Sequence, residues 1–91
     1  MSVDSSALER QLRQEGFRHV YVWSDAANAF YSDHVHPVDT AHIILDGEMT
    51  LTCGGSTTTY RTGERPPDVP GGAVHSARMG PTGCRYLIGE K

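Results

Sequence analysis

Hydrophobic and polar residues alternate with a period of two along most of this chain, a pattern typical of half-buried β-strands. Residues 17–23 form one run rich in strand-forming side chains, and shorter runs cover residues 29–31 and 57–62. Turn-forming residues separate these runs at short and regular intervals. The pattern therefore predicts an all-β sandwich or barrel over most of the sequence.

One stretch at the N-terminus follows helical spacing instead. Leu8 and Leu12 lie four residues apart with polar residues between them. Ser6 and Glu9 fit a capping box, in which Ser6 caps the helix and Glu9 reaches back to it. We predict a helix over about residues 7–15, ended by Gly16 and packed on the outside of the domain or in a subunit contact.

Two hairpins follow from the turn signals in the second half of the chain. Asp46-Gly47 stands between two alternating runs, which favours a tight turn there. In that register His42 lies on an apolar face that points inward. Ala41, Ile43 and Leu45 lie on the other, more polar face, which points outward. A second hairpin across residues 80–83 places His75 inward. Residues 54–56 are expected to form a further turn.

Three histidines carry the clearest chemical signal. His34 and His36 are separated by one residue, so on an extended segment both imidazoles point to the same side. His75 follows a Pro-Gly-Gly segment far along the chain and offers a third imidazole. We predict that these three side chains converge on one divalent metal ion.

Size, charge and cysteine content narrow the class of protein. The chain has 91 residues, a net charge of −3 and two cysteines. We expect one domain, with residues 1–16 as a helix that belongs to it and residues 17–91 as the barrel. Without a basic cluster, a long apolar run or an export signal, we expect no nucleic-acid partner, no membrane span and a cytoplasmic location with free thiols. The aromatic surface of residues 17–23 predicts a homodimer that uses the N-terminal segment.

The histidine segments resemble the two motifs of the cupin superfamily. His34, His36, Thr40 and Gly47 are similar to the first motif, although Thr40 stands where a ligand Glu is usual. Gly63, Pro70, Gly72 and His75 are similar to the second motif, with Met79 where Asn is usual. The resemblance covers about residues 33–79. It implies a small double-stranded β-helix, or RmlC-like jelly-roll barrel, with a metal site inside one end.

Replacing the usual Glu by Thr40 changes the expected chemistry of the metal. Three neutral imidazoles leave its charge uncompensated, which favours an anionic and often chelating ligand. Imidazole ligation leaves Fe, Zn, Ni, Cu and Mn all open. Three roles are open for His42: a fourth metal ligand, a residue that contacts the other ligands or the substrate, or a core residue. Further residues expected to line the pocket are Thr40, Met49, Cys53 and Met79, and Tyr86 is a candidate proton donor.

Two function classes agree with this sequence. One is a small metalloenzyme, such as an oxygenase, isomerase or lyase, that acts on a small anionic or enolisable molecule. The other is a non-catalytic module that binds or senses a small ligand in the same barrel. The absence of room for an output domain favours the enzyme, but a fold does not fix a function.

Overall fold

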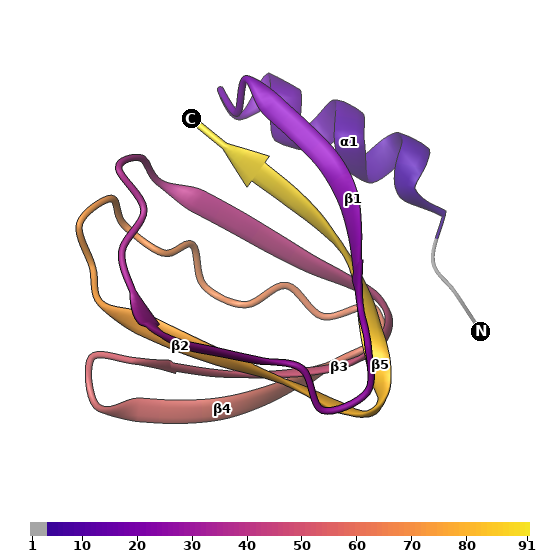
Figure 1. The fold of residues 1–91 in the computed structure, drawn as a ribbon. Coiled ribbons are helices and arrows are strands. Elements are labelled where there is room, and N and C mark those ends of the chain that lie inside the picture. Colours follow the sequence, from indigo (N-terminus) through magenta and orange to yellow (C-terminus); the bar gives the residue numbers. More distant parts are fainter. Residues whose placement is uncertain (1–3) are drawn as a thin grey trace.

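The computed structural model describes residues 4–91, which form one helix and five strands (Figure 1). The predicted all-β class with one N-terminal helix is confirmed. The elements are α1 (Ser5–Gln14), β1 (His19–Asp25), β2 (Phe30–His34), β3 (Thr40–Cys53), β4 (Ser56–Arg61) and β5 (His75–Glu90). All strand pairs are antiparallel. The described helix is not long and apolar enough to cross a membrane.

The last strand, β5, joins the two walls of the barrel. Its first half pairs with β2 and with the second half of β3, which in turn pairs with β4. Its second half pairs with β1 and with the first half of β3. Figure 1 shows the result: the long strands β3 and β5 bend as they pass from one wall to the other.

The two predicted hairpins at residues 46–47 and 80–83 are wrong. Both segments lie inside continuous strands, and β3 pairs with β5 rather than folding back on itself. The β3–β5 register shifts between Ile44 and Asp46 and again between Gly47 and Met49, so the residues expected to make a turn instead lie between two irregularities at which the strand bends. The turn at Gly54-Gly55 is confirmed, since it joins Cys53 to Ser56 in the β3–β4 pair.

Both faces of the first half of β3 are buried, which corrects the prediction of a polar outer face. Helix α1 covers that face, because Leu12 and Phe17 pack against residues of β3 and β5. The members of this outer cluster from the two strands are Ala41, Ile43, Leu45 and Leu87. The sequence pattern identified the alternation correctly, but it could not tell that a helix would shield the second face.

The helix begins earlier than predicted, at Ser5. Asp4, not Ser6, is the N-cap, and its carboxylate accepts a hydrogen bond from the Ser6 backbone N–H at 3.1 Å. The predicted stop at Gly16 is confirmed: it has φ +102°, and the backbone N–H of Phe17 donates to the carbonyl of Leu12.

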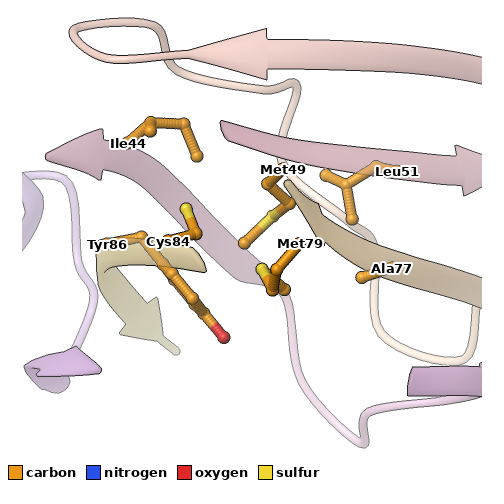
Figure 2. Packing of buried hydrophobic residues seen from close by; sticks show 7 residues of the cluster. All are labelled: Ile44, Met49, Leu51, Ala77, Met79, Cys84 and Tyr86. Carbon is orange, nitrogen blue, oxygen red and sulfur yellow. The ribbon is translucent and has the colours of Figure 1, made fainter. Parts of the chain in front are cut away.

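A second apolar cluster lines the inside of the barrel (Figure 2). Its side chains come from the inward positions of β3 and β5, and Met49 faces Met79 across the strand pair. The full cluster is Ile44, Met49, Leu51, Ala77, Met79, Cys84 and Tyr86.

Candidate metal centre

His34 and His75 are brought together by strand pairing. They are direct partners in the β2–β5 register, after an irregularity that follows Tyr31. His36 lies just beyond the end of β2, and Val35 between the two histidines is 54% exposed. His34 and His36 therefore lie on one side of the segment, as predicted, and Val35 lies on the other.

The three imidazoles form a compact group. One ring nitrogen from each of His34, His36 and His75 lies within 4.8 Å of the other two. The ring centroids are 4.2 Å apart for His34 and His75, and 5.0 Å apart for each of the other two pairs. His75 is 2% exposed. The three histidines therefore lie close together, and His75 is the most buried of them.

Backbone hydrogen bonds fix the segment that precedes His75. The Gly72 N–H donates to the carbonyl of His36 at 2.9 Å. The Gly71 N–H donates to the Asp39 carboxylate, also at 2.9 Å, and a Cβ at Gly71 would press on the Val38 backbone. The Pro-Gly-Gly segment can therefore lie directly against the histidine loop, which sets the position of His75 relative to His36.

The orientation of the rings fits a divalent metal. Nδ1 of His34 lies 2.7 Å from the Ser32 carbonyl, and Nδ1 of His75 lies 3.2 Å from the Ala73 carbonyl. A proton on each Nδ1 satisfies these carbonyls and leaves Nε2 with a free lone pair, as in metal-binding histidines. Two nitrogens bound to one tetrahedral Zn²⁺ lie about 3.4 Å apart, which falls inside the 4.8 Å limit that the three ring nitrogens meet.

A cavity of about 290 Å³ opens onto the three histidines. Aromatic and apolar side chains make most of its wall. Besides the histidines it is lined by Tyr21, Trp23, Tyr31, Thr40, His42, Met49, Leu51, Ala77, Met79, Tyr86, Ile88 and Glu90. Among residues 4–91, Glu90 is the only acidic side chain in this lining.

His42 lines the same cavity but stands outside the group of three. Its cross-strand partner is Ile88, not the predicted Leu51, and it is 8% exposed. Burial lowers its pKa to about 4, so the imidazole is neutral at pH 7. Its Nδ1 is buried and has no hydrogen-bond partner among the described residues. A proton there would be an unsatisfied donor, which favours the tautomer with the proton on Nε2.

A carboxylate network borders the cavity wall. Asp25 accepts hydrogen bonds from the hydroxyls of Tyr31 and Tyr86, at 2.6 and 2.7 Å, and from the Trp23 indole N–H at 3.1 Å. Burial, and then the bond to Asp25, raises the pKa of Tyr86. Tyr86 therefore keeps its proton at neutral pH and acts as a donor, not as a base.

The predicted pocket residues separate into two groups. Thr40, Met49, Met79 and Tyr86 line the cavity. Cys53 does not: it faces a separate depression near Gly54 and Ala73, although it pairs with His75 in the β3–β5 register. The expectation for Cys53 depended on a hairpin pairing with Thr40 that does not form. Cys53 and Cys84 are both free thiols.

Sequence reasoning missed Glu90 and Asp25. Glu90 has the same strand parity as Tyr86 and Ile88, so alternation along β5 was a usable signal for its inward position. Asp25 offers no local signal, because its partners Tyr31 and Tyr86 come from two other strands.

The comparisons with known proteins agree with this architecture. No protein-family model and no curated protein matches the sequence. A cupin superfamily protein from Desulfitobacterium hafniense superposes with a TM-score of 0.71 at 19% identity, over 99% of this chain and 72% of that one. A Klebsiella pneumoniae protein with a double-stranded β-helix domain gives 0.65 at 24% identity, over 78% and 64%. The DMSP lyase DddQ from Ruegeria pomeroyi gives 0.71 at 25% identity, over 79% and 36%.

This chain therefore has the cupin fold, a double-stranded β-helix, and the resemblance seen in the sequence is confirmed at the level of the fold. It spans less than two thirds of the Klebsiella protein and about a third of the lyase. These similarities show a shared architecture. The group of three histidines is a feature of this chain's own geometry.

Proposed function

We propose that this chain is a small metal-dependent enzyme that acts on a small anionic or enolisable molecule. The observation that carries the proposal is the group of three histidine nitrogens within 4.8 Å of one another, facing a cavity. His34, His36 and His75 would hold one divalent metal ion. When bound, the metal supplies a Lewis acid that neutralises and polarises an anionic ligand.

The remaining cavity residues select and orient such a ligand. His42 presents its Nε2–H as a neutral donor, since its Nδ1 is buried. The aromatic wall, which includes Trp23 and Tyr31, offers apolar surface to the carbon part of the ligand. Tyr86 donates its hydroxyl proton to Asp25 and keeps that proton at neutral pH, so towards a ligand its oxygen offers only a hydrogen-bond acceptor.

The reaction classes that fit are oxygenase chemistry, which includes the dioxygenase type, isomerase chemistry and lyase chemistry. The similarity to a DMSP lyase supports the lyase class, although this chain spans only 36% of that protein. A binding or sensing module is the second candidate, favoured by the largely apolar cavity. Turnover separates the two candidates.

Metal analysis tests the proposal directly. Protein purified without a metal-affinity tag should contain about one divalent metal ion per chain, or take one up on titration. His34→Ala and His75→Ala should lose it, whereas the exposed His19 provides a matched control in His19→Ala. Oxygen uptake with diketones, thiols and catechols, and NMR assays of small carboxylates, then assign the class. Retention of full metal affinity in both triad variants contradicts the proposal.

We extend the proposal to assembly and location. Tyr21 and Trp23, from the aromatic run of residues 17–23, are 40% and 49% exposed, which favours a homodimer that uses the N-terminal segment. The two free thiols favour a reducing, cytoplasmic compartment. Light scattering that gives a monomer mass at micromolar concentration contradicts the dimer, and cell fractionation checks the location.

A further inference from the structure

The cavity wall carries one carboxylate that has no cationic partner in the part of the chain that the structure describes. Glu90 lines the cavity and is half-buried, and it accepts a hydrogen bond from the Tyr21 hydroxyl at 3.4 Å. Within residues 4–91 it forms no ion pair, and no Lys or Arg lines this cavity. The Lys91 ammonium points elsewhere, since it lies 5.1 Å from the centroid of the Phe17 ring in the outer cluster. Burying a carboxylate without a cation costs free energy, so a positively charged ligand would be stabilised here.

Two aromatic rings of β1 continue the cavity wall from this carboxylate. Tyr21 and Trp23 are two residues apart on the strand, so both side chains point to the same side. That side is the cavity, because Val20 and Val22 pack against the outer cluster on the other side. The two rings line the cavity and are still 40% and 49% exposed, so they offer ring surface to a ligand. The face of an aromatic ring attracts a cation, and Trp does so most strongly.

The polar groups of the aromatic wall are already bonded to a second carboxylate. The Trp23 indole N–H and the Tyr31 hydroxyl donate to the same oxygen, Oδ1 of Asp25, at 3.1 and 2.6 Å. The Tyr86 hydroxyl donates to the other oxygen, Oδ2, at 2.7 Å. These donors are therefore engaged and cannot bind an anion, while the charge of Asp25 favours a cation nearby. This part of the wall suits a positive group, whereas a metal at the three histidines suits a negative one.

We propose that the cavity binds an organic ammonium group, held by the Glu90 carboxylate and the ring faces of Tyr21 and Trp23. This cation site does not need the metal. Its combination with a metal-bound anion rests on the proposed function, and it makes the ligand a small zwitterion with an acidic group at the metal and an ammonium group against β1. Amino acids and their N-methylated derivatives belong to this class. The cavity volume of about 290 Å³ restricts the ligand to a small molecule.

Binding of simple ammonium compounds to metal-free protein tests the cation site apart from the metal. Choline and its uncharged analogue, in which carbon replaces the nitrogen, share one shape, so their comparison isolates the charge. Trp23 is the only Trp of the chain, and its fluorescence should change as choline saturates the site at constant ionic strength. We expect choline to bind about 10-fold more tightly than the analogue. Ethanolamine is titrated in parallel: if it binds more tightly than choline the group is a protonated amine, and if less tightly a quaternary ammonium.

Substitutions in the wall locate the site. Glu90→Gln removes the charge and keeps the size of the side chain, so the affinity for choline should fall by about 5-fold, with no change for the uncharged analogue. Glu9→Gln on α1, outside the cavity, is the matched control. Trp23→Leu should also weaken choline binding, which is then followed by NMR because the fluorophore is lost.

Three results overturn the proposal. The first is equal affinity of the wild-type protein for choline and its uncharged analogue, and the second is an unchanged affinity for choline in Glu90→Gln. The third is a dimer that binds no choline, because a second copy then covers Tyr21 and Trp23. Metal titration of the same proteins keeps this proposal apart from the proposed function: retention of the metal in His75→Ala contradicts the metal centre and leaves choline binding as it was.

Discussion

A methyl group added at Gly47 should destabilise the fold more than the same change at a turn glycine. Gly47 lies where β3 bends, with φ +90°, and a Cβ there would overlap the carbonyl oxygen of Gly83 on β5. Gly55, in the β3–β4 turn, has a similar φ of +81°, but a Cβ there would meet no heavy atom within 4 Å. Both substitutions therefore carry the free-energy cost of a left-handed backbone, and only Gly47→Ala adds a steric clash.

The expected magnitudes follow from these two terms. An L-residue in the left-handed region costs about 1–2 kcal/mol, which applies to both variants. Forcing a methyl group into a packed backbone contact adds about 1–3 kcal/mol at Gly47 only. The loss of unfolded-chain entropy on replacing Gly by Ala is the same in both and cancels. Gly47→Ala should therefore be less stable than Gly55→Ala by at least about 1 kcal/mol.

Urea unfolding followed by circular dichroism measures this difference. For a domain of this size 1 kcal/mol corresponds to about 4–8 °C in melting temperature, which gives a second readout. Equal m-values in the two variants are needed, since they show that the unfolded states match. Costs that agree within about 0.5 kcal/mol would refute the reasoning, because the approach of β3 to β5 at Gly47 would then be loose.

Two further predictions concern burial. Burial lowers the pKa of His42 from 6.5 to about 4 in the folded protein, so as the pH falls this imidazole is protonated in the unfolded chain before it is protonated in the folded one. The free energy of unfolding should therefore fall as the pH drops from 6.5 to 4, by up to about 3 kcal/mol. In metal-free protein, urea unfolding at pH 7 and 4.5 should show a smaller fall for His42→Gln, and equal falls contradict a neutral buried His42. Leu12→Ala should cost about 2–5 kcal/mol, and clearly more than Leu8→Ala, because Leu12 is fully buried. A negligible cost would show that α1 is not part of the barrel domain.

Strand parity and the metal motif could be predicted from the sequence alone. The alternation of side chains with a period of two is a local property, so it placed His34 with His36. His42 and Tyr86 do line the cavity as predicted, but that prediction used two hairpin registers that do not form. The Gly54-Gly55 turn and the stop at Gly16 are equally local, because both depend on backbone conformations that glycine adopts at little cost.

Which strand pairs with which was decided only by the tertiary structure. Asp46-Gly47 suits a tight turn and a strand irregularity alike, and pairing with the distant β5 selected the second. The same long-range pairing placed Glu90 opposite Thr40, brought Asp25 to Tyr86, and moved Cys53 away from the cavity. These contacts join residues far apart in sequence, and no local pattern encodes which strand will lie beside which.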